Sequence, residues 1–143
     1  MKMAISEKLR EKVRQKYNGL CAYSGTPLED DWQVDHVKPK YLFEIGLEEG
    51  NPDDIDNLMP VQKLINHYKR ALDLENFRNE RLGRMHLQIA ELPKNPRTEK
   101  SKKRKKYLLK IADYFGITEK KPFNKIFYFE TLMDAAEKKI FTE

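Results

Sequence analysis

Apolar side chains recur every four residues near the start of the chain, and this spacing predicts an amphipathic helix over residues 6–18. The stripe consists of Ile5, Leu9, Val13 and Tyr17. Ser6 is expected to cap the helix, because its hydroxyl can accept a hydrogen bond from a backbone N–H of the first turn. Gly19 suits the left-handed conformation that often follows a helix end. Basic residues cover the other faces of this helix.

Two β-favouring runs follow, and together they predict a β-hairpin over residues 20–37. Its second strand would occupy residues 32–37, after a turn signal of Ser, Gly, Thr and Pro at residues 24–27. Residues 38–56 form a long acidic loop with one helical turn expected near residues 41–45, and loops of this length are often functional. The acidic residues lack the ligand spacing of an EF-hand, so a solvated loop is favoured over a calcium site.

The second half of the chain is expected to be mainly helical. A helix is predicted to begin at Pro60, because proline suits the first turn of a helix. Its apolar face would consist of Val61, Leu64, Ile65 and Tyr68. A further helix would be capped by Asp73 and would end before Pro93. The apolar stripe of this second helix would consist of Leu74, Phe77, Leu82, Met85 and Ile89.

A basic segment follows these helices. Residues 93–100 contain two prolines and are expected to form a linker. Six of the seven residues at positions 100–106 are basic, and they lead into a helix that Gly116 should close. Residues 126–129 favour a strand, and residues 131–141 are expected to form a last helix.

Composition narrows the class of protein. The chain has 143 residues, which is the usual size of one domain, and a net charge of +5, which favours polyanionic partners. The lone cysteine, Cys21, excludes an intramolecular disulfide framework and is expected to be a small core residue. No apolar run approaches the roughly 18 residues of a membrane helix. The protein is therefore expected to be cytoplasmic, either associated with the nucleoid or acting in a phage-infected cell.

The strongest chemical signal is an Asp-His pair followed by two asparagines. Asp35 and His36 end the expected strand, Asn57 lies in an Asp-Asn-Leu sequence, and Asn66 follows nine residues later. Hydrolysis of a phosphodiester needs an activated water and stabilisation of the charge that develops on the phosphate and the leaving oxygen. An imidazole can accept the proton of the water, while carboxylate and amide oxygens suit a hard divalent cation. Neighbouring residues on a regular strand point to opposite faces, so the pair can share one site only if the strand ends there.

The flanking residues add to this pattern. Asn57 can donate and accept hydrogen bonds, so it suits holding the loop that carries His36. Asn66 offers an amide oxygen from the expected helix, and Lys69 follows on the same face, where it could contact a phosphate. Taken singly, Asn57 could be only a turn residue and Asn66 only a surface residue. Their combination with Asp35 and His36 favours a hydrolytic site.

These motifs resemble the HNH nuclease family, whose ββα-metal fold occurs in homing nickases, colicin DNases and the HNH domain of CRISPR effectors. The resemblance covers residues 13–78, and the flanks QVDHVKPK and NLMPVQKLINHYKRALDLENFR look like a phage and bacterial subgroup. It implies an α+β fold, in which a ββα-metal core of a β-hairpin and a helix is elaborated by N- and C-terminal helices. Residues 1–92 would form the nuclease core with its N-terminal helix. Residues 93–143 would form a basic linker and an extension that packs on or beside the core as a single compact unit.

The resemblance also implies roles for individual residues. Asp35 and Asn66 would hold one divalent metal ion, His36 would be the general base, and Asn57 would order the loop of His36. The ion would be Mg²⁺ or Mn²⁺, with Ni²⁺ or Zn²⁺ as alternatives. The expected nucleic-acid contacts are Lys38, His67, Lys69, Lys102, Lys103, Arg104 and Lys105.

One departure from the family concerns the structural zinc that many relatives bind through two CxxC pairs. The first pair corresponds here to Cys21 and Ser24, and the second to Gln62 and Ile65. One sulfur ligand out of four does not make a tetrahedral zinc site, so no structural zinc is expected. The fold would then depend on packing of the helix against the first helix and the hairpin.

The sequence therefore predicts a metal-dependent DNA endonuclease of HNH type, with a role in phage biology or bacterial defence as one setting. DNA is the expected partner, no membrane association is expected, and a homodimer or a larger protein assembly is left open. A first alternative is a non-catalytic nucleic-acid-binding module that keeps the fold. A second is an effector subunit of a larger assembly that docks through the tail from Ile126.

Overall fold

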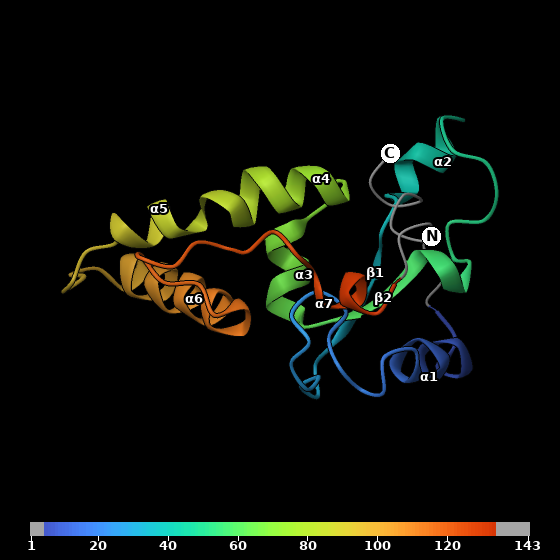
Figure 1. Ribbon diagram of the computed structural model, residues 1–143, viewed down its shortest axis with the longest axis horizontal. Coiled ribbons are helices and arrows are strands. Elements are labelled where there is room, and N and C mark those ends of the chain that lie inside the picture. The colour runs from blue at the N-terminus through green and yellow to red at the C-terminus, as the bar shows by residue number, and fades with distance from the viewer. Residues whose placement is uncertain (1–4, 134–143) are drawn as a thin grey trace. The chain divides into compact units, whose positions relative to one another are not determined.

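The computed structural model describes residues 5–133 and combines seven α-helices and short helical turns with a two-stranded antiparallel sheet, an α+β architecture (Figure 1). The chain divides into two compact units. The first holds the residues up to Leu74 together with those from Phe127, and the second is Glu75–Ile126. The sequence predicts a core over residues 1–92 and an extension over residues 93–143 that pack as one compact unit. The two observed units divide the chain at other positions. No helix within residues 5–133 is long and apolar enough to cross a membrane.

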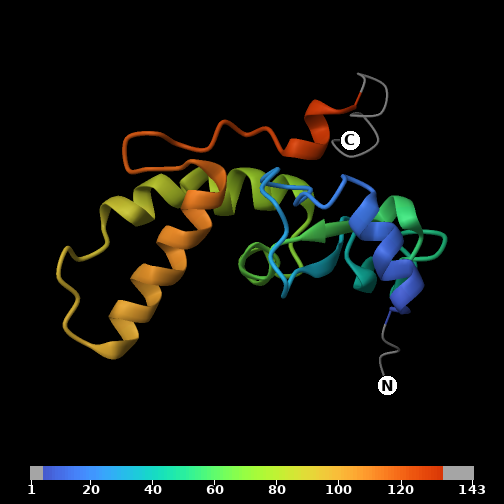
Figure 2. The same cartoon turned by 90° about the horizontal axis from the view of Figure 1, so that it is seen from below.

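The N-terminal helix α1 covers Glu7–Gln15 and lies beside the sheet of the first unit (Figure 2). The expected cap is confirmed, since the Ser6 hydroxyl accepts a hydrogen bond from the Leu9 N–H at 3.2 Å. Val13 is fully buried and forms a core cluster with Trp32 and Leu58. The predicted apolar stripe therefore faces the core.

The sheet pairs two segments that are far apart in the sequence. Strand β1, Gln33–His36, runs antiparallel to strand β2, Leu58–Val61, with His36 opposite Leu58. The predicted hairpin over residues 20–37 is wrong, because residues 20–27 form a tight turn with only one bridge, between Leu20 and Pro27. The four residues of β2 are all buried, and this apolar run supplies the partner strand from beyond the long loop.

Pro60 belongs to β2, opposite Val34, so the prediction that it begins a helix is also wrong. A proline can occupy this place because each strand of a two-stranded sheet has an open edge, where a missing N–H leaves no ladder bond unmade. Helix α3 begins three residues later and covers Lys63–Lys69. Its buried residues are Ile65, Tyr68 and Lys69.

The loop between the strands contains the expected helical turn, α2 at Lys40–Glu44, and the turn η1 at Ile55–Asn57. Its remaining residues are irregular. Because β1 ends at His36 and β2 begins after η1, this loop starts and ends beside the Asp-His pair.

The segment from Phe127 returns to the first unit. Phe127 and Phe129 are fully buried, and both rings pack against Tyr23, with ring centroids 5.1 Å and 6.1 Å away. Residues 126–129 do not form the predicted strand, because helix α7 already begins at Tyr128 and ends at Thr131. The start of the tail from Ile126 is therefore largely core rather than a docking surface. The helix predicted for residues 131–141 lies mostly outside the described residues.

The second unit is a pair of helical segments joined by the expected proline-containing linker (Figures 1 and 2). The helix predicted from Asp73 is broken into four pieces: α4 at Leu74–Asn76, a π-helical segment η2 at Phe77–Arg81, a 3₁₀ turn η3 at Leu82–Arg84, and α5 at Met85–Ala90. A Cβ at Gly83 would lie 3.0 Å from the Arg78 carbonyl oxygen, so this irregular turn favours glycine. Helix α6 covers Glu99–Phe115, and Gly116 closes it with a φ of 68° as predicted.

Candidate active site

Asp35, His36 and Lys69 line one open cavity of about 410 Å³ in the first unit. Its wall is completed by Pro39, Lys40, Tyr41, Glu44, Arg70 and Ala71. Strand β1 ends at His36, so the condition for the Asp-His pair to share a site is met. The structure thus brings the pair together with the end of α3.

Asp35 is buried, with 6% of its surface exposed. Its Oδ2 accepts a hydrogen bond from the Tyr23 hydroxyl at 2.5 Å and lies 3.2 Å from the Lys69 ammonium. Its Oδ1 takes no hydrogen bond from any residue that the structure describes. Burial, followed by the negative charge of Asp35, raises the pKa of Tyr23 well above 10.0, so the phenol stays protonated and donates to the carboxylate.

Lys69 lies inside the site rather than on its surface. Its side chain is 1% exposed, and its ammonium approaches the His36 carbonyl oxygen at 3.4 Å as well as the Asp35 carboxylate. A buried ammonium needs a counter-charge, which Asp35 supplies. The expected phosphate contact is therefore not available to Lys69 in this arrangement, although the residue does line the cavity.

His36 is held by a partner that the sequence did not reveal. Its Nε2 lies 2.7 Å from Oδ1 of Asp53, and the Lys40 ammonium lies 3.9 Å from the same oxygen. A carboxylate can only accept, so this hydrogen bond requires a proton on Nε2. In the neutral ring, Nδ1 is then the proton acceptor. Asp53 belongs to the acidic loop and resembles its neighbours in sequence, so no local signal distinguishes it.

Asn57 makes the contacts expected of a residue that orders the loop after His36. Its Oδ1 accepts from the Lys38 N–H at 2.8 Å, and its Nδ2 donates to the Lys38 and Pro52 carbonyl oxygens at 3.1 Å and 2.8 Å. Its own carbonyl accepts from the Val37 N–H at 3.0 Å. Asn57 therefore ties the start of the loop, at Val37 and Lys38, to its later part at Pro52.

Asn66 is placed near this site but outside the wall of the cavity. Its Nδ2 donates to Oε1 of Gln33 at 2.8 Å, and Gln33 shares a face of β1 with Asp35, because the two are separated by one residue. Its Oδ1 makes no hydrogen bond within the described part of the chain. The structure thus brings Asn66 to the face of β1 that carries Asp35, but it does not place Asn66 beside the Asp35 carboxylate.

The two expected ligands can be compared with the needs of a divalent cation. Each keeps one hard oxygen, Oδ1 of Asp35 and Oδ1 of Asn66, free of hydrogen bonds from residues 5–133. Those residues contain no group of three or more His, Cys, Asp or Glu side chains arranged for a metal. Mg²⁺ commonly retains several waters and uses only one or two protein ligands, so oxygen donors of this kind suit it. The opposing feature is the ammonium of Lys69, which already neutralises Asp35.

The other expected nucleic-acid contacts are scattered. His67 is exposed on α3, whereas the Lys38 ammonium pairs with Glu48 at 3.3 Å and faces a separate hollow. In the second unit, Lys102, Lys103 and Arg104 are exposed on α6. Lys105 differs from these three residues. Its ammonium donates to the Pro93 and Lys94 carbonyl oxygens at 2.9 Å and 2.8 Å and so anchors the linker.

The four positions that the resemblance assigns to zinc cysteines lie in a region held by hydrogen bonds and packing. Gln62 is buried, its Nε2 donates to the Pro27 carbonyl at 2.7 Å and to Thr26 Oγ1 at 3.1 Å, and its Oε1 accepts from the Glu29 N–H at 3.0 Å. Cys21 and Ile65 are fully buried, and Ser24 Oγ lies 2.7 Å from Thr26 Oγ1. Gln62 therefore ties the turn over residues 24–29 to the start of α3.

No family model, curated protein or solved structure matches this chain. The spacing of its motifs and the geometry of the described residues are therefore the features from which a function can be proposed.

Proposed function

We propose that this protein is a metal-dependent endonuclease of the HNH type that hydrolyses phosphodiester bonds of DNA. The observation that carries the proposal is the placement of Asp35 and His36 at the end of β1, on the wall of one open cavity. Asn57, spaced as the HNH pattern requires, holds the loop that follows His36.

The order of elements supports a ββα-metal core. A first strand that ends in Asp-His, a long loop, a second antiparallel strand and a helix follow one another as β1, β2 and α3. The helix carries Asn66 in its first turn, at the position of the last metal ligand in the HNH pattern. The lack of zinc cysteines does not affect this order, because Gln62 joins the same two segments.

The chemistry of the proposed site begins with His36. With the proton on Nε2 shared with Asp53, Nδ1 can take a proton from a water that attacks the phosphorus. Asp53 orients the ring and stabilises the imidazolium that results. Asn57 keeps the backbone after His36 in place, so that the ring stays at the end of β1.

Asp35 and Asn66 would hold the divalent cation, Mg²⁺ or Mn²⁺, which supplies positive charge to the phosphate and the leaving 3′-oxygen. Both residues offer oxygen ligands, as these hard cations require. Tyr23 fixes the carboxylate of Asp35 through its hydroxyl, and its ring packs edge-on against both Phe127 and Phe129. The carboxylate therefore has one orientation with respect to the cavity.

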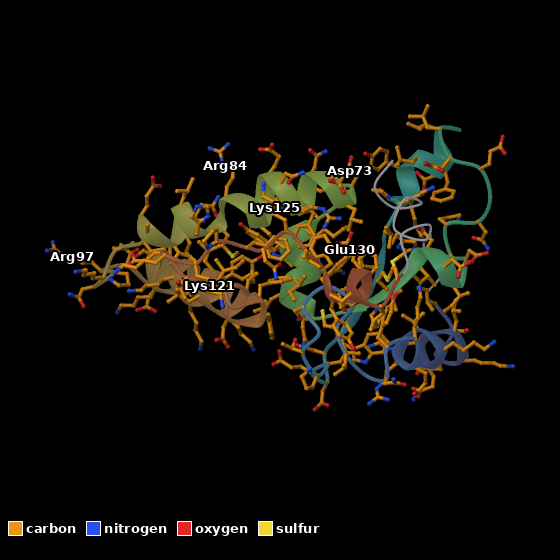
Figure 3. The ribbon with its side chains drawn as sticks, viewed as in Figure 1. Asp73, Arg84, Arg97, Lys121, Lys125 and Glu130 are labelled. Carbon is orange, nitrogen blue, oxygen red and sulfur yellow. The ribbon has the colours of Figure 1, made fainter. Side chains whose placement is uncertain are left out.

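The distribution of charge supports a nucleic-acid substrate. The second unit contains 15 Lys and Arg against 6 Asp and Glu, a net of +9, whereas the remaining residues contain 13 against 17, a net of −4. The cations of α6 include Lys103, Lys106 and Lys110, which are exposed and share one face at spacings of three and four. Arg84 and Arg97 point away from the ribbon of this unit (Figure 3). We infer that the second unit supplies most of the attraction for the phosphate backbone.

A plasmid-cleavage assay tests the proposal. Purified protein is incubated with supercoiled DNA in Mg²⁺, Mn²⁺, Ni²⁺ or EDTA, and His36→Ala is the matched variant. We expect nicking or linearisation with a divalent cation, none in EDTA, and none by His36→Ala despite unchanged DNA affinity. Cleavage by His36→Ala at the wild-type rate would refute the role of the imidazole.

A non-catalytic nucleic-acid-binding module is the second candidate, and the Asp35–Lys69 pair favours it, because a neutralised carboxylate has less attraction for a cation. This candidate predicts salt-dependent DNA binding with no cleavage by the wild-type protein in any of the metals. The same assay, combined with a binding measurement, therefore separates the two.

A further inference from the structure

The ion pair of Asp35 and Lys69 is buried on both sides, with side chains that are 7% and 1% exposed. Removing two opposite charges from water is costly, and such a pair persists only if each charge is well compensated. The Asp35 carboxylate also accepts from Tyr23, and the Lys69 ammonium also approaches the His36 carbonyl oxygen. The pair is thus built into the site rather than formed by chance contact of two flexible side chains.

The end of α3 holds the ammonium in this position. Lys69 is the last residue of the helix, and Arg70 follows with a φ of 56°, which turns the chain away at once. Both residues line the cavity. The stem of Lys69 is therefore buried in the unit while its charged end reaches the one carboxylate that could serve as a metal ligand.

A divalent cation on Asp35 would lie close to the Lys69 ammonium, whose nitrogen is 3.2 Å from Oδ2. Two cations bound to the same carboxylate in a poorly solvated site repel each other strongly. We infer that Lys69 is the resident counter-cation of Asp35: its ammonium neutralises the carboxylate in the metal-free protein and withdraws from it when a divalent cation binds. The inference rests on the proposed function, which makes Asp35 a metal ligand.

The ammonium that leaves Asp35 would move into the cavity. Because Lys69 forms part of the cavity wall, a change of its terminal torsions moves the charge into the space where a substrate phosphate would lie. A flexible lysine stem with a compact ammonium suits such a transfer. Lys69 would then become the phosphate contact that its position in the sequence suggests, but only in the metal-loaded protein.

Calorimetric titration of Mn²⁺ in the absence of DNA tests the inference. Lys69→Gln removes the competing charge, and Lys63→Gln removes the same charge from an exposed position of the same helix. We expect Lys69→Gln to bind Mn²⁺ about tenfold more tightly than wild type, because a repulsive charge is removed. Lys63→Gln should stay within about twofold. Asp35→Asn should abolish the binding that these variants share.

Two results would overturn the inference. Equal or weaker Mn²⁺ binding by Lys69→Gln would mean that Lys69 supports the metal site instead of competing with the cation. Failure of the wild-type protein to bind Mn²⁺ in a manner that depends on Asp35 would show that no cation displaces Lys69 from Asp35.

A second measurement uses the wild-type protein alone, in case Lys69→Gln does not fold. Acylation of lysines, followed by peptide mass spectrometry, reports the exposure of each ammonium with and without Mn²⁺. Lys69 should be protected in the metal-free protein and should react several-fold faster once Mn²⁺ is bound, whereas Lys63 should react equally in both states. Unchanged protection of Lys69 at saturating Mn²⁺ would contradict the withdrawal.

The outcome is separate from that of the proposed function. A protein that cuts DNA but shows no effect of Lys69→Gln on Mn²⁺ affinity refutes only the counter-cation role. A protein that shows the exchange but cuts no DNA in any metal refutes only the nuclease.

Discussion

The imidazole of His36 lies 2.7 Å from the carboxylate of Asp53, through Nε2 and Oδ1 respectively. The two residues are 17 positions apart and belong to the end of β1 and to the long loop that follows it. Asn57 donates to the carbonyl oxygen of Pro52, directly before Asp53, and also bonds to Lys38, two residues after the strand. The loop that carries the carboxylate is therefore tied to the backbone beside the imidazole.

Asp53→Asn should lower the rate of DNA cleavage by about tenfold to a hundredfold, because the ring loses its charged acceptor and part of its orientation. An amide can still accept a hydrogen bond at this position, but it does not stabilise an imidazolium. Asp54→Asn is the matched control, since Asp54 is a neighbouring exposed carboxylate that accepts from the Asp56 N–H. Single-turnover cleavage at saturating DNA is the measurement. Equal rates for the two variants would show that Asp53 has no part in orienting the ring.

Gln62→Ala should destabilise the first unit by about 2–4 kcal/mol, because a buried side chain with three hydrogen bonds is removed and its partners are left unsatisfied. Gln15→Ala is the control, since Gln15 is exposed on α1 and its side-chain amide donates to Glu11. Its effect should stay within about 0.5 kcal/mol. Urea unfolding followed by circular dichroism measures both. A decrease of similar size in the two variants would contradict the idea that Gln62 ties the turn over residues 24–29 to the start of α3.

The raised pKa of Tyr23 predicts that the folded protein loses stability at alkaline pH. Its pKa is raised in the folded protein, mainly by burial and then by the charge of Asp35, so the folded state keeps the phenolic proton after the unfolded chain has released it. The stability contributed by Tyr23 is therefore complete below about pH 10 and declines as the pH rises further.

Tyr23→Phe removes this contribution and the hydrogen bond to Asp35, so the variant should be less stable than wild type at neutral pH. The difference in the free energy of unfolding should narrow as the pH passes about 10. Tyr41→Phe is the control, because Tyr41 is 47% exposed. Denaturant titrations at a series of pH values give the result. A difference that stays constant up to the highest pH at which the protein folds would contradict the argument.

Sequence patterns predicted the elements whose signals are local. Helix α1 follows from the spacing of Val13 and its neighbours with the Ser6 cap, and α6 follows from its periodicity and from Gly116. The pairing of β1 was predicted incorrectly, because it depends on Leu58–Val61 at the far end of a long loop, a non-local choice that periodicity does not encode. Pro60 added to the error, since proline suits both a helix start and an open strand edge.

The candidate site likewise contains residues that the sequence pattern predicts and residues that only the fold reveals. Asp35, His36 and Asn57 could be predicted because their residue types and spacing form a pattern, and the structure gives Asn57 the expected contacts. Asp53 could not, because the loop offers several equivalent acids and only its folded path selects one. Nor could the burial of Lys69, since it depends on how α3 packs against β1.

The exposed face of α6 formed by Lys103, Lys106 and Lys110 should account for much of the salt dependence of DNA binding. Each lysine–phosphate interaction that a substitution removes lowers the slope of log K against log salt by about 0.9. Replacing the three lysines together with Gln should therefore reduce the slope by about 2–3 and weaken binding at low salt. We attribute this change in slope to the position of the three lysines, which lie in the unit with a net charge of +9.

A control triple variant with Gln at Lys8, Lys12 and Lys63 removes the same total charge from exposed positions of the other unit. Fluorescence anisotropy with a labelled duplex, at several salt concentrations and in EDTA, compares the two without interference from cleavage. If the helix face is the binding surface, only the α6 variant should show the full reduction in slope. Equal changes in both variants would mean that net charge alone attracts the DNA, and α6 would then have no special role.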